Sequence, residues 1–221
     1  MRVLDTVLTL VAAPQCLWCH QPSAWGEPVC AACDAEFGVL VAAHPRHPVP
    51  EGLDDLWSAV PYAGNVRTWV ARVKTGRSVL AARQLAQRMA WHYKPLPDDI
   101  AAQRWIVPIA LPARRWISRG FNQAHILAHA LAEQHGGQMR TVLTTSPWRS
   151  SLSRLNRGQR LASDHSFGLQ GSASMPGPAT VWIVDDVVTN GTTMQRAAAA
   201  LRARWPHVRL YGITLCRTPP L

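Results

Sequence analysis

The sequence predicts an α/β fold, in which a parallel sheet is flanked by helices and preceded by a small metal-binding module. Three observations support this prediction. The apolar run Val181 to Val184 is followed by a loop and an amphipathic helix, and the run Trp105 to Ile109 is followed by the same order of elements. Such strand, loop and helix repeats are typical of parallel sheets. Four cysteines near the amino terminus form two closely spaced pairs.

The length and composition describe a globular protein. With 221 residues, 48% hydrophobic and 16% charged, the chain suffices for one well-buried α/β domain and a small appendage. No apolar run approaches the length of about 18 residues that a transmembrane helix needs, so we expect no membrane insertion. Asp5 interrupts the apolar amino terminus, which argues against a signal peptide. We therefore expect a cytoplasmic protein.

The net charge of +10 is concentrated in the middle of the chain. Nine arginines and only one acidic residue, Glu133, lie between Arg104 and Arg160, which gives this stretch a charge of +8. A local positive field of this kind attracts either a polyanionic small molecule or a nucleic acid backbone.

The cysteines Cys16, Cys19, Cys30 and Cys33 form two CxxC pairs separated by ten residues. Four thiolates on two tight turns suit a tetrahedral zinc ion, and closed sites with four cysteines usually stabilise a fold. Disulfides are less favoured because nothing exports the chain, and a redox CxxC motif does not need a second copy. Ala42 to Gly52 is rich in proline and is interpreted as a linker. Residues 1–50 thus form the zinc module and linker, and residues 51–221 form the main domain.

The main domain has a predictable order of elements. Lys74 to Arg77 separates two helical patterns and could contact a phosphate or form a solvated connection. The remaining expected elements are an edge strand at Leu56 to Tyr62, helices at Val66 to Val73 and Val79 to Trp91, a central strand at Trp105 to Ile109, a helix through Ala124 to Leu131, a weak strand at Thr141 to Thr145 and a final strand at Arg209 to Cys216.

The stretch VWIVDDVVTNGTTM, Val181 to Met194, organises the predicted domain. Asp185 and Asp186 follow the apolar run, so we expect them at the carboxyl end of a buried strand, where ligands of open α/β sheets bind. Thr192 or Thr193 is available as the N-cap of the next helix, whose first N–H groups favour an anion. The alternative is an aspartate pair that only caps the turn.

This stretch resembles the phosphoribosyl-pyrophosphate (PRPP) motif of type I phosphoribosyltransferases. The resemblance implies that Asp185 and Asp186 accept hydrogen bonds from the ribose hydroxyls and act as the catalytic pair. It also implies that the loop binds the 5′-phosphate through hydroxyls and N–H groups. The loop residues are Thr189, Asn190, Gly191, Thr192 and Thr193, with Asn190 standing where the family usually has threonine.

The segment Arg119-Gly120-Phe121-Asn122-Gln123 follows an apolar strand and a short basic loop, and it resembles the ComF family of competence and GntX-like proteins. That family joins a zinc module to a type I phosphoribosyltransferase domain. The resemblance implies that the pyrophosphate loop contains Arg114, Arg115, Arg119 and Gly120. A solvated basic turn is the alternative. Arg157 and Arg160 are the best candidates in a mobile lid that closes over PRPP.

Two functions are consistent with these residues. The first is a transferase that moves the phosphoribosyl group from PRPP, with Mg²⁺, to an acceptor that is either a base or an amine. The second, which the resemblance to the ComF family implies, is an accessory protein of DNA uptake that binds single-stranded nucleic acid or the competence machinery. The zinc module and the arginine stretch with Trp116 and Trp148 resemble parts of a single-strand binding surface.

Overall fold

We analysed a computed structural model of the chain. It describes residues 15–24, 27–42, 48–75, 78–95, 99–145, 167–171 and 177–219. The elements are α2 (Ala31–Ala42), β1 (Asp55–Pro61), α3 (Gly64–Thr75), α4 (Val79–His92), the 3-10 helix η1 (Ala101–Gln103), β2 (Arg104–Pro108), α5 (Ala113–Arg119), α6 (Gln123–His135), β3 (Gln138–Met139), β4 (Leu143–Thr145), β5 (Phe167–Leu169), β6 (Thr180–Val188), α8 (Thr192–Arg204) and β7 (Arg209–Arg217).

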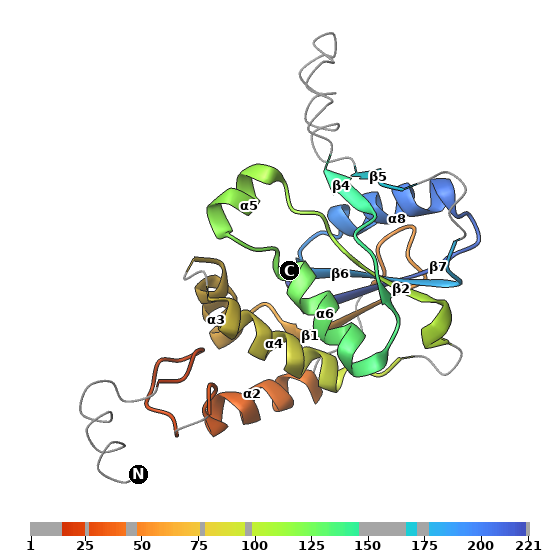
Figure 1. The fold of residues 1–221 in the computed structure, drawn as a ribbon. Helices are drawn as coiled ribbons and strands as arrows, with labels where there is room; N and C mark the ends of the chain where they lie inside the picture. Colours follow the sequence, from red (N-terminus) through yellow and green to blue (C-terminus); the bar gives the residue numbers. More distant parts are fainter. Residues whose placement is uncertain are drawn as a thin grey trace.

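Five strands form a parallel sheet in the order β1-β7-β6-β2-β3 (Figure 1). Strand β6 is central, and its residues Val181 to Val184 are fully buried, as expected for a strand covered on both faces. Strand β1 lies at one edge of the sheet and ends at Pro61, which confirms the predicted edge strand. Strands β4 and β5 form a separate antiparallel pair.

Helices cover both faces of the sheet, which confirms the predicted α/β class. In Figure 1, α4 and α6 lie together on one side of the sheet and α8 lies on the other. The alternation along β6 follows this arrangement: Trp182 and Val184 belong to the core under α4 and α6, whereas Val181 and Ile183 pack with α8 residues.

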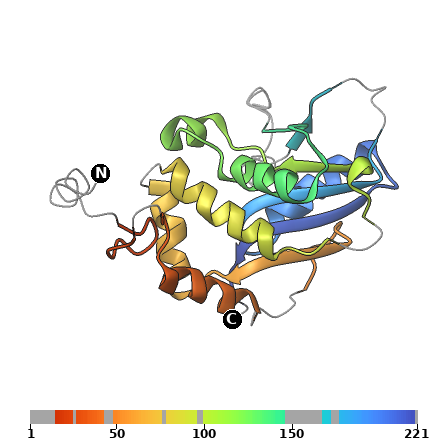
Figure 2. The same ribbon diagram turned by 60° about the horizontal axis from the view of Figure 1, so that its bottom comes forward.

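The amino-terminal segment packs directly on the main sheet domain. Figure 2 shows α2 beside α3 and β1. Trp18 and Phe37 are buried against Trp69 of α3, with ring centroids 4.6 Å and 6.4 Å from that of Trp69. The hydrophobic core of the cysteine segment is therefore continuous with the core of the sheet domain.

Two local expectations need correction, and one short strand was not expected. The basic stretch after β2 is a helix, α5, and not a loop. Strand β6 does not end at Val184 but continues through both aspartates to Val188, because β7 remains paired with it along this length. Strand β3 was not expected; it adds two residues beside β2. Within the described residues, no helix combines the length and the apolar character needed to cross a membrane.

Candidate functional site

The site is built where β6 extends beyond its neighbour β2. Their ladder ends at the pair Pro108 and Val184, followed by one further bond from the Ile109 N–H to the Val184 carbonyl at 2.9 Å. The chain then leaves the sheet into α5, while β6 continues beside β7 alone. Asp185 and Asp186 are the first residues of this extension, so none of the described strands pairs with the side of their backbone that faces away from β7.

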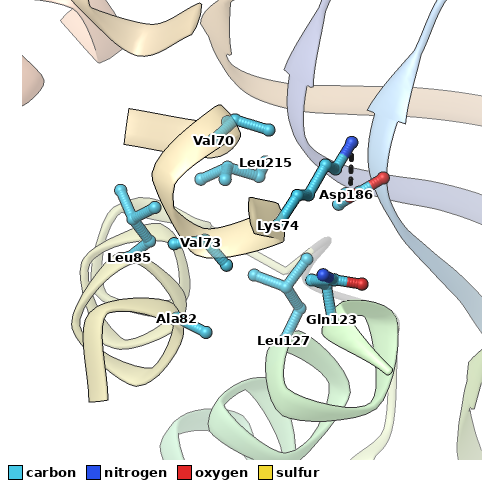
Figure 3. Close-up of a pocket in the computed structure, with 9 residues that line it drawn as sticks. All are labelled: Val70, Val73, Lys74, Ala82, Leu85, Gln123, Leu127, Asp186 and Leu215. Carbon is cyan, nitrogen blue, oxygen red and sulfur yellow. Dashed lines mark ion pairs between the residues drawn. The ribbon is translucent and has the colours of Figure 1, made fainter. Parts of the chain in front are cut away.

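The two aspartate side chains face opposite sides of the sheet, because successive strand side chains alternate. Asp186 points toward α3, where its Oδ2 lies 2.8 Å from Lys74 Nζ (Figure 3). Asp185 therefore points toward the α8 side, and its Oδ1 accepts the Asp186 N–H at 2.8 Å. The structure thus gives Asp186 a cationic partner, whereas Asp185 accepts a hydrogen bond from the backbone of its own neighbour.

Burial raises the pKa of Asp185 to about 8, and repulsion by the neighbouring Asp186 carboxylate adds to the shift. The Asp186 N–H and the Lys74 ammonium oppose this rise only in part. With a pKa of about 8, Asp185 of this partly buried acidic pair keeps its proton at neutral pH. Such a pair is suited to accept hydroxyl or cationic donors, which stabilise its ionised form.

The loop after β6 leads directly into helix α8. Gly191 is the N-cap of α8, with φ +78°, so neither Thr192 nor Thr193 caps the helix as the sequence suggested. Asn190 supplies a cap from one position earlier, because its Oδ1 accepts the Thr192 N–H at 3.2 Å. The Thr189, Asn190 and Thr193 side chains are exposed. The loop therefore presents polar groups to solvent at the amino end of a 13-residue helix.

Helix α5 carries the predicted arginines at the carboxyl edge of the sheet, where it projects above α3 (Figure 1). Arg114 and Arg115 are exposed and free to meet a ligand from solvent. Arg119 is partly buried, and its Nη1 donates to Gln123 Oε1 at 3.1 Å. Gly120 ends the helix in the left-handed conformation, with φ +80°. Of these four residues, Arg119 and Gly120 thus have a structural part in the turn into α6.

The next residues of the same segment join α5 to the sheet. Asn122 caps α6 by accepting the Ala124 N–H at 3.1 Å, and its Nδ2 donates to the Ile109 carbonyl at 2.9 Å. Phe121 packs against the core. This segment therefore fixes α5 above the end of β2.

A narrow cleft lies between α3, α4 and α6, beside Asp186 (Figure 3). Its walls are mainly apolar, and its polar groups belong to Lys74, Asp186 and Gln123. The apolar lining residues are Val70, Val73, Ala82, Leu85, Leu127 and Leu215. Gln123 is 5% exposed, and its Nε2 has no hydrogen-bond partner among the described residues.

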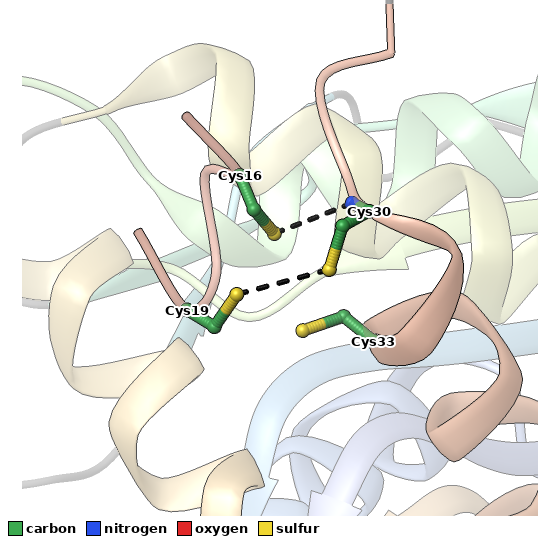
Figure 4. A group of neighbouring side chains, drawn as sticks. All are labelled: Cys16, Cys19, Cys30 and Cys33. Atoms are coloured by element: carbon green, nitrogen blue, oxygen red, sulfur yellow. Dashed lines mark hydrogen bonds between the residues drawn. The ribbon is translucent and has the colours of Figure 1, made fainter. Parts of the chain in front are cut away.

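The four cysteines converge as the sequence predicted. The Sγ atoms of Cys16, Cys19, Cys30 and Cys33 all lie within 4.8 Å of one another (Figure 4). Cys19 Sγ and Cys30 Sγ are 3.7 Å apart, close to the separation of about 3.8 Å between two sulfurs bound to one tetrahedral zinc. The cysteines could therefore hold a metal ion such as zinc.

Backbone N–H groups around this cluster favour the thiolate form of Cys16. Burial raises the pKa of Cys16, but N–H groups more than offset it and the pKa falls to about 6. Among them, the Trp18 and Cys30 N–H groups each donate to Cys16 Sγ at 3.4 Å. Burial and the neighbouring thiols raise the pKa of Cys33. Four adjacent thiolates are unfavourable without a cation, so a metal ion would remove the conflict.

The structure reveals two residues that the sequence did not place in the site. Lys74 was considered for a phosphate contact, but its partner is the Asp186 carboxylate. Gln123 belongs to the segment Arg119 to Gln123, but the sequence assigns it no role of its own. The structure buries it beside the cleft. Arg77, Arg157 and Arg160 lie outside the described residues.

Comparisons with known proteins add no assignment: no protein-family model matches the chain, and no curated protein does.

Proposed function

We propose that this protein binds PRPP at the carboxyl edge of the sheet and transfers its phosphoribosyl group to an acceptor. The observation that carries the proposal is the continuous run from the Asp185–Asp186 pair through the Thr189 to Gly191 loop into the amino end of α8. The run offers carboxylate acceptors for ribose hydroxyls and N–H donors for a phosphate, one after the other.

The leaving group would meet the arginines of α5. In the reaction the bond from ribose C1 to the diphosphate oxygen breaks, its electron pair leaves with diphosphate, and a bond from the acceptor to C1 forms. Arg114 and Arg115 are exposed at this edge and suit a bidentate contact with diphosphate. Because such a transition state is stabilised mainly by position and charge, no nucleophilic side chain is required.

Mg²⁺ enters the proposal with PRPP. Among the described residues, the cysteine cluster is the only group of three or more ligand-type side chains that could hold a metal ion. The diphosphate of PRPP would therefore supply the oxygen ligands, and Mg²⁺ would neutralise charge on the leaving group.

The cysteine cluster would hold a structural zinc ion. A closed set of four thiolates leaves no open position for a reacting ligand, so this metal would stabilise the segment that packs on α3 and β1. Together with the PRPP site, it makes the chain a ComF-like protein in this proposal.

The test is PRPP binding with and without Mg²⁺, measured by thermal shift and by calorimetry. We expect stabilisation of the wild type and at least tenfold weaker binding by Asp185→Asn and Asp186→Asn, because each removes a carboxylate that is ionised in the PRPP complex, where a hydrogen bond to a charged acceptor is worth about 1.5–3 kcal/mol. Glu133→Gln is the matched control, since Glu133 is exposed on α6 and, among the described residues, its ion pair is with His129. Absence of PRPP binding by the wild type would refute the proposal.

A second candidate function rests on α5. Its exposed Trp116, 54% accessible, stands among Arg114, Arg115 and Arg119 on a projecting helix. Bases stack on exposed aromatic rings and arginines follow phosphates, so α5 would bind single-stranded DNA in an accessory role in competence. This function requires a salt-dependent affinity for an oligonucleotide that Trp116→Ala and Arg115→Ala both reduce, with PRPP binding retained by Trp116→Ala. Equal affinity of these variants and the wild type would exclude it.

A further inference from the structure

The four thiols of the cysteine cluster differ in their access to solvent. Cys16 and Cys33 are buried, with exposed fractions of 0% and 5%. Cys19 and Cys30 are partly exposed. Cys16 Sγ also accepts the Trp18 and Cys30 N–H groups, each at 3.4 Å. Because oxidation requires access to the sulfur, a small oxidant from solvent meets Cys19 and Cys30 first.

The two partly exposed sulfurs are also neighbours. Cys19 Sγ and Cys30 Sγ lie 3.7 Å apart and belong to the two different CxxC pairs (Figure 4). A disulfide needs its sulfurs about 2.05 Å apart, so this pair must close by roughly 1.6 Å. Rotation of the two side chains between rotamers covers a distance of this size. The pair is therefore close to the geometry of a cross-link between the two turns.

Contacts outside the cluster hold the two turns in this position. The Trp18 ring, in the first turn, packs on Trp69 with centroids 4.6 Å apart, and the Trp18 carbonyl accepts a hydrogen bond from Arg72 of α3. Helix α2, which follows the second turn, is joined to α3 by a hydrogen bond of 2.9 Å from Asn65 Nδ2 to Glu36 Oε1. No cysteine takes part in these contacts, so they keep the two sulfurs adjacent when a metal ion leaves.

We propose that Cys19 and Cys30 are an oxidative modification site, at which a peroxide converts the two thiolates into a disulfide and the bound metal ion is released. One thiolate attacks a peroxide oxygen: an S–O bond forms, the O–O bond breaks, and its electron pair leaves with hydroxide. The other thiolate then attacks this sulfur, so that the S–S bond forms and the second oxygen leaves as hydroxide. The two electrons lost by the sulfurs are gained by the peroxide, and two protons from solvent convert both hydroxides into water.

Metal release follows from the loss of two ligands. After oxidation only Cys16 and Cys33 remain of the four thiolates that a closed tetrahedral site requires. This release rests on the structural zinc ion of the proposed function. The disulfide itself rests only on the exposure and the separation of the two sulfurs.

Peroxide treatment of the full chain, purified in the presence of zinc, tests the site. After hydrogen peroxide is added, a zinc-binding dye follows the metal, and the remaining thiols are alkylated with N-ethylmaleimide under denaturing conditions. Chymotrypsin cleavage after Trp18 and Trp25 separates the first two cysteines from each other and from the second pair. Tandem mass spectrometry, with fragmentation between Cys30 and Cys33, then identifies the linked sulfurs.

We expect about one Cys19–Cys30 disulfide and about one released zinc ion per chain, with Cys16 and Cys33 alkylated. Dithiothreitol with added zinc should restore the reduced, metal-bound form, because thiol–disulfide exchange reverses the bond. Cys216→Ala is the matched control. Since Cys216 is buried and lies outside the cluster, this variant should give the same disulfide and the same zinc release.

Several results would overturn the inference: a disulfide within one CxxC pair, a link that includes Cys16 or Cys33, or sulfinic acid without a disulfide. Zinc in the purified protein together with Cys19 and Cys30 that peroxide leaves reduced would reject the modification site alone. A chain that holds no zinc but forms the Cys19–Cys30 disulfide would instead support the modification site and reject the structural zinc ion.

Discussion

At the residue scale, the loop that begins α8 requires a residue without a side chain at Gly191. Its φ of +78° lies in the left-handed region, and an added Cβ would stand 2.8 Å from Pro50 Cγ. An L-residue there is strained, and the proline ring cannot yield as a flexible side chain would. The linker before β1 thus fixes the conformation of the loop that begins α8.

We therefore expect Gly191→Ala to destabilise the protein by about 1–3 kcal/mol and to abolish PRPP binding. Gly38→Ala is the control, because Gly38 lies within α2 and nothing is within 4 Å of its added Cβ. That change should be neutral or stabilising by up to about 1 kcal/mol. Urea denaturation measures both, and equal effects at the two glycines would contradict this account.

Asp185 gives the site a pH dependence of defined sign. The folded protein raises the pKa of Asp185 from the ordinary value of 3.8 to about 8, chiefly through burial. Between these values the folded state keeps a proton that the unfolded state has lost, so this contribution to stability falls as pH rises.

The free energy of unfolding of the wild type, relative to Asp185→Asn, should therefore decrease from pH ~5 to pH ~7, with a slope of at most about 1.4 kcal/mol per pH unit. Above pH ~8 the difference should level off. Denaturant titrations at several pH values measure it. A difference that is flat or that rises across this range would show that Asp185 is ionised in the folded protein.

At the scale of elements, the cysteine segment packs against α3 through aromatic rings. Trp18 lies between Phe37 of α2 and Trp69 of α3, and all three rings are buried. The cysteine cluster holds the turn that carries Trp18, because Cys16 and Cys19 flank it. Loss of a metal ion bound by this cluster should therefore affect α3, whose last turn carries Lys74.

Cys16→Ser should reduce the zinc content from about one ion per chain and lower the melting temperature, since metal binding contributes folding free energy. Cys216→Ala is the control, because this buried cysteine lies outside the cluster and should keep its zinc. Elemental analysis together with thermal unfolding measures both effects. Unchanged zinc in Cys16→Ser would refute the metal site.

At the scale of the whole molecule, the buried ion pair of Arg104 and Asp99 lies at the end of the sheet opposite the aspartate pair. It joins several elements there. The Arg104 Nε donates to Asp99 Oδ1 at 3.0 Å, and Trp182 Nε1 donates to Asp99 Oδ2 at 2.6 Å. Arg104 also donates to the His135 carbonyl at 3.0 Å, and its guanidinium lies 3.8 Å from the centroid of a Trp182 ring. The start of β2, the end of α6 and the first part of β6 are therefore held together.

We expect Arg104→Met to destabilise the protein by about 3–5 kcal/mol, because it leaves the buried Asp99 carboxylate without its cation. Glu133→Gln removes an exposed pair and should cost less than about 1 kcal/mol. Reversible chemical denaturation of both variants tests this difference. An effect of Arg104→Met as small as that of Glu133→Gln would contradict this account.

Sequence patterns within short segments predicted much of the fold. The apolar run of β6, the amphipathic period of α8 and the CxxC spacing predicted a parallel α/β sheet and a cysteine cluster. The α5 helix was missed because a seven-residue segment with every side chain exposed except Arg119 has no apolar period to reveal it. The length of β6 was missed because pairing with β7, not propensity, extends it past the aspartates.

The cysteine set and the order of acidic, threonine and glycine residues from β6 to α8 can be read from the chain alone, because this chemistry lies within short continuous segments. The pairing of Lys74 with Asp186, and the hydrogen bond by which Arg119 orients Gln123 beside the same cleft, follow only from the packing of distant elements. Contacts between α3, β6 and α6 depend on how helices pack across a sheet, and no local period encodes that packing.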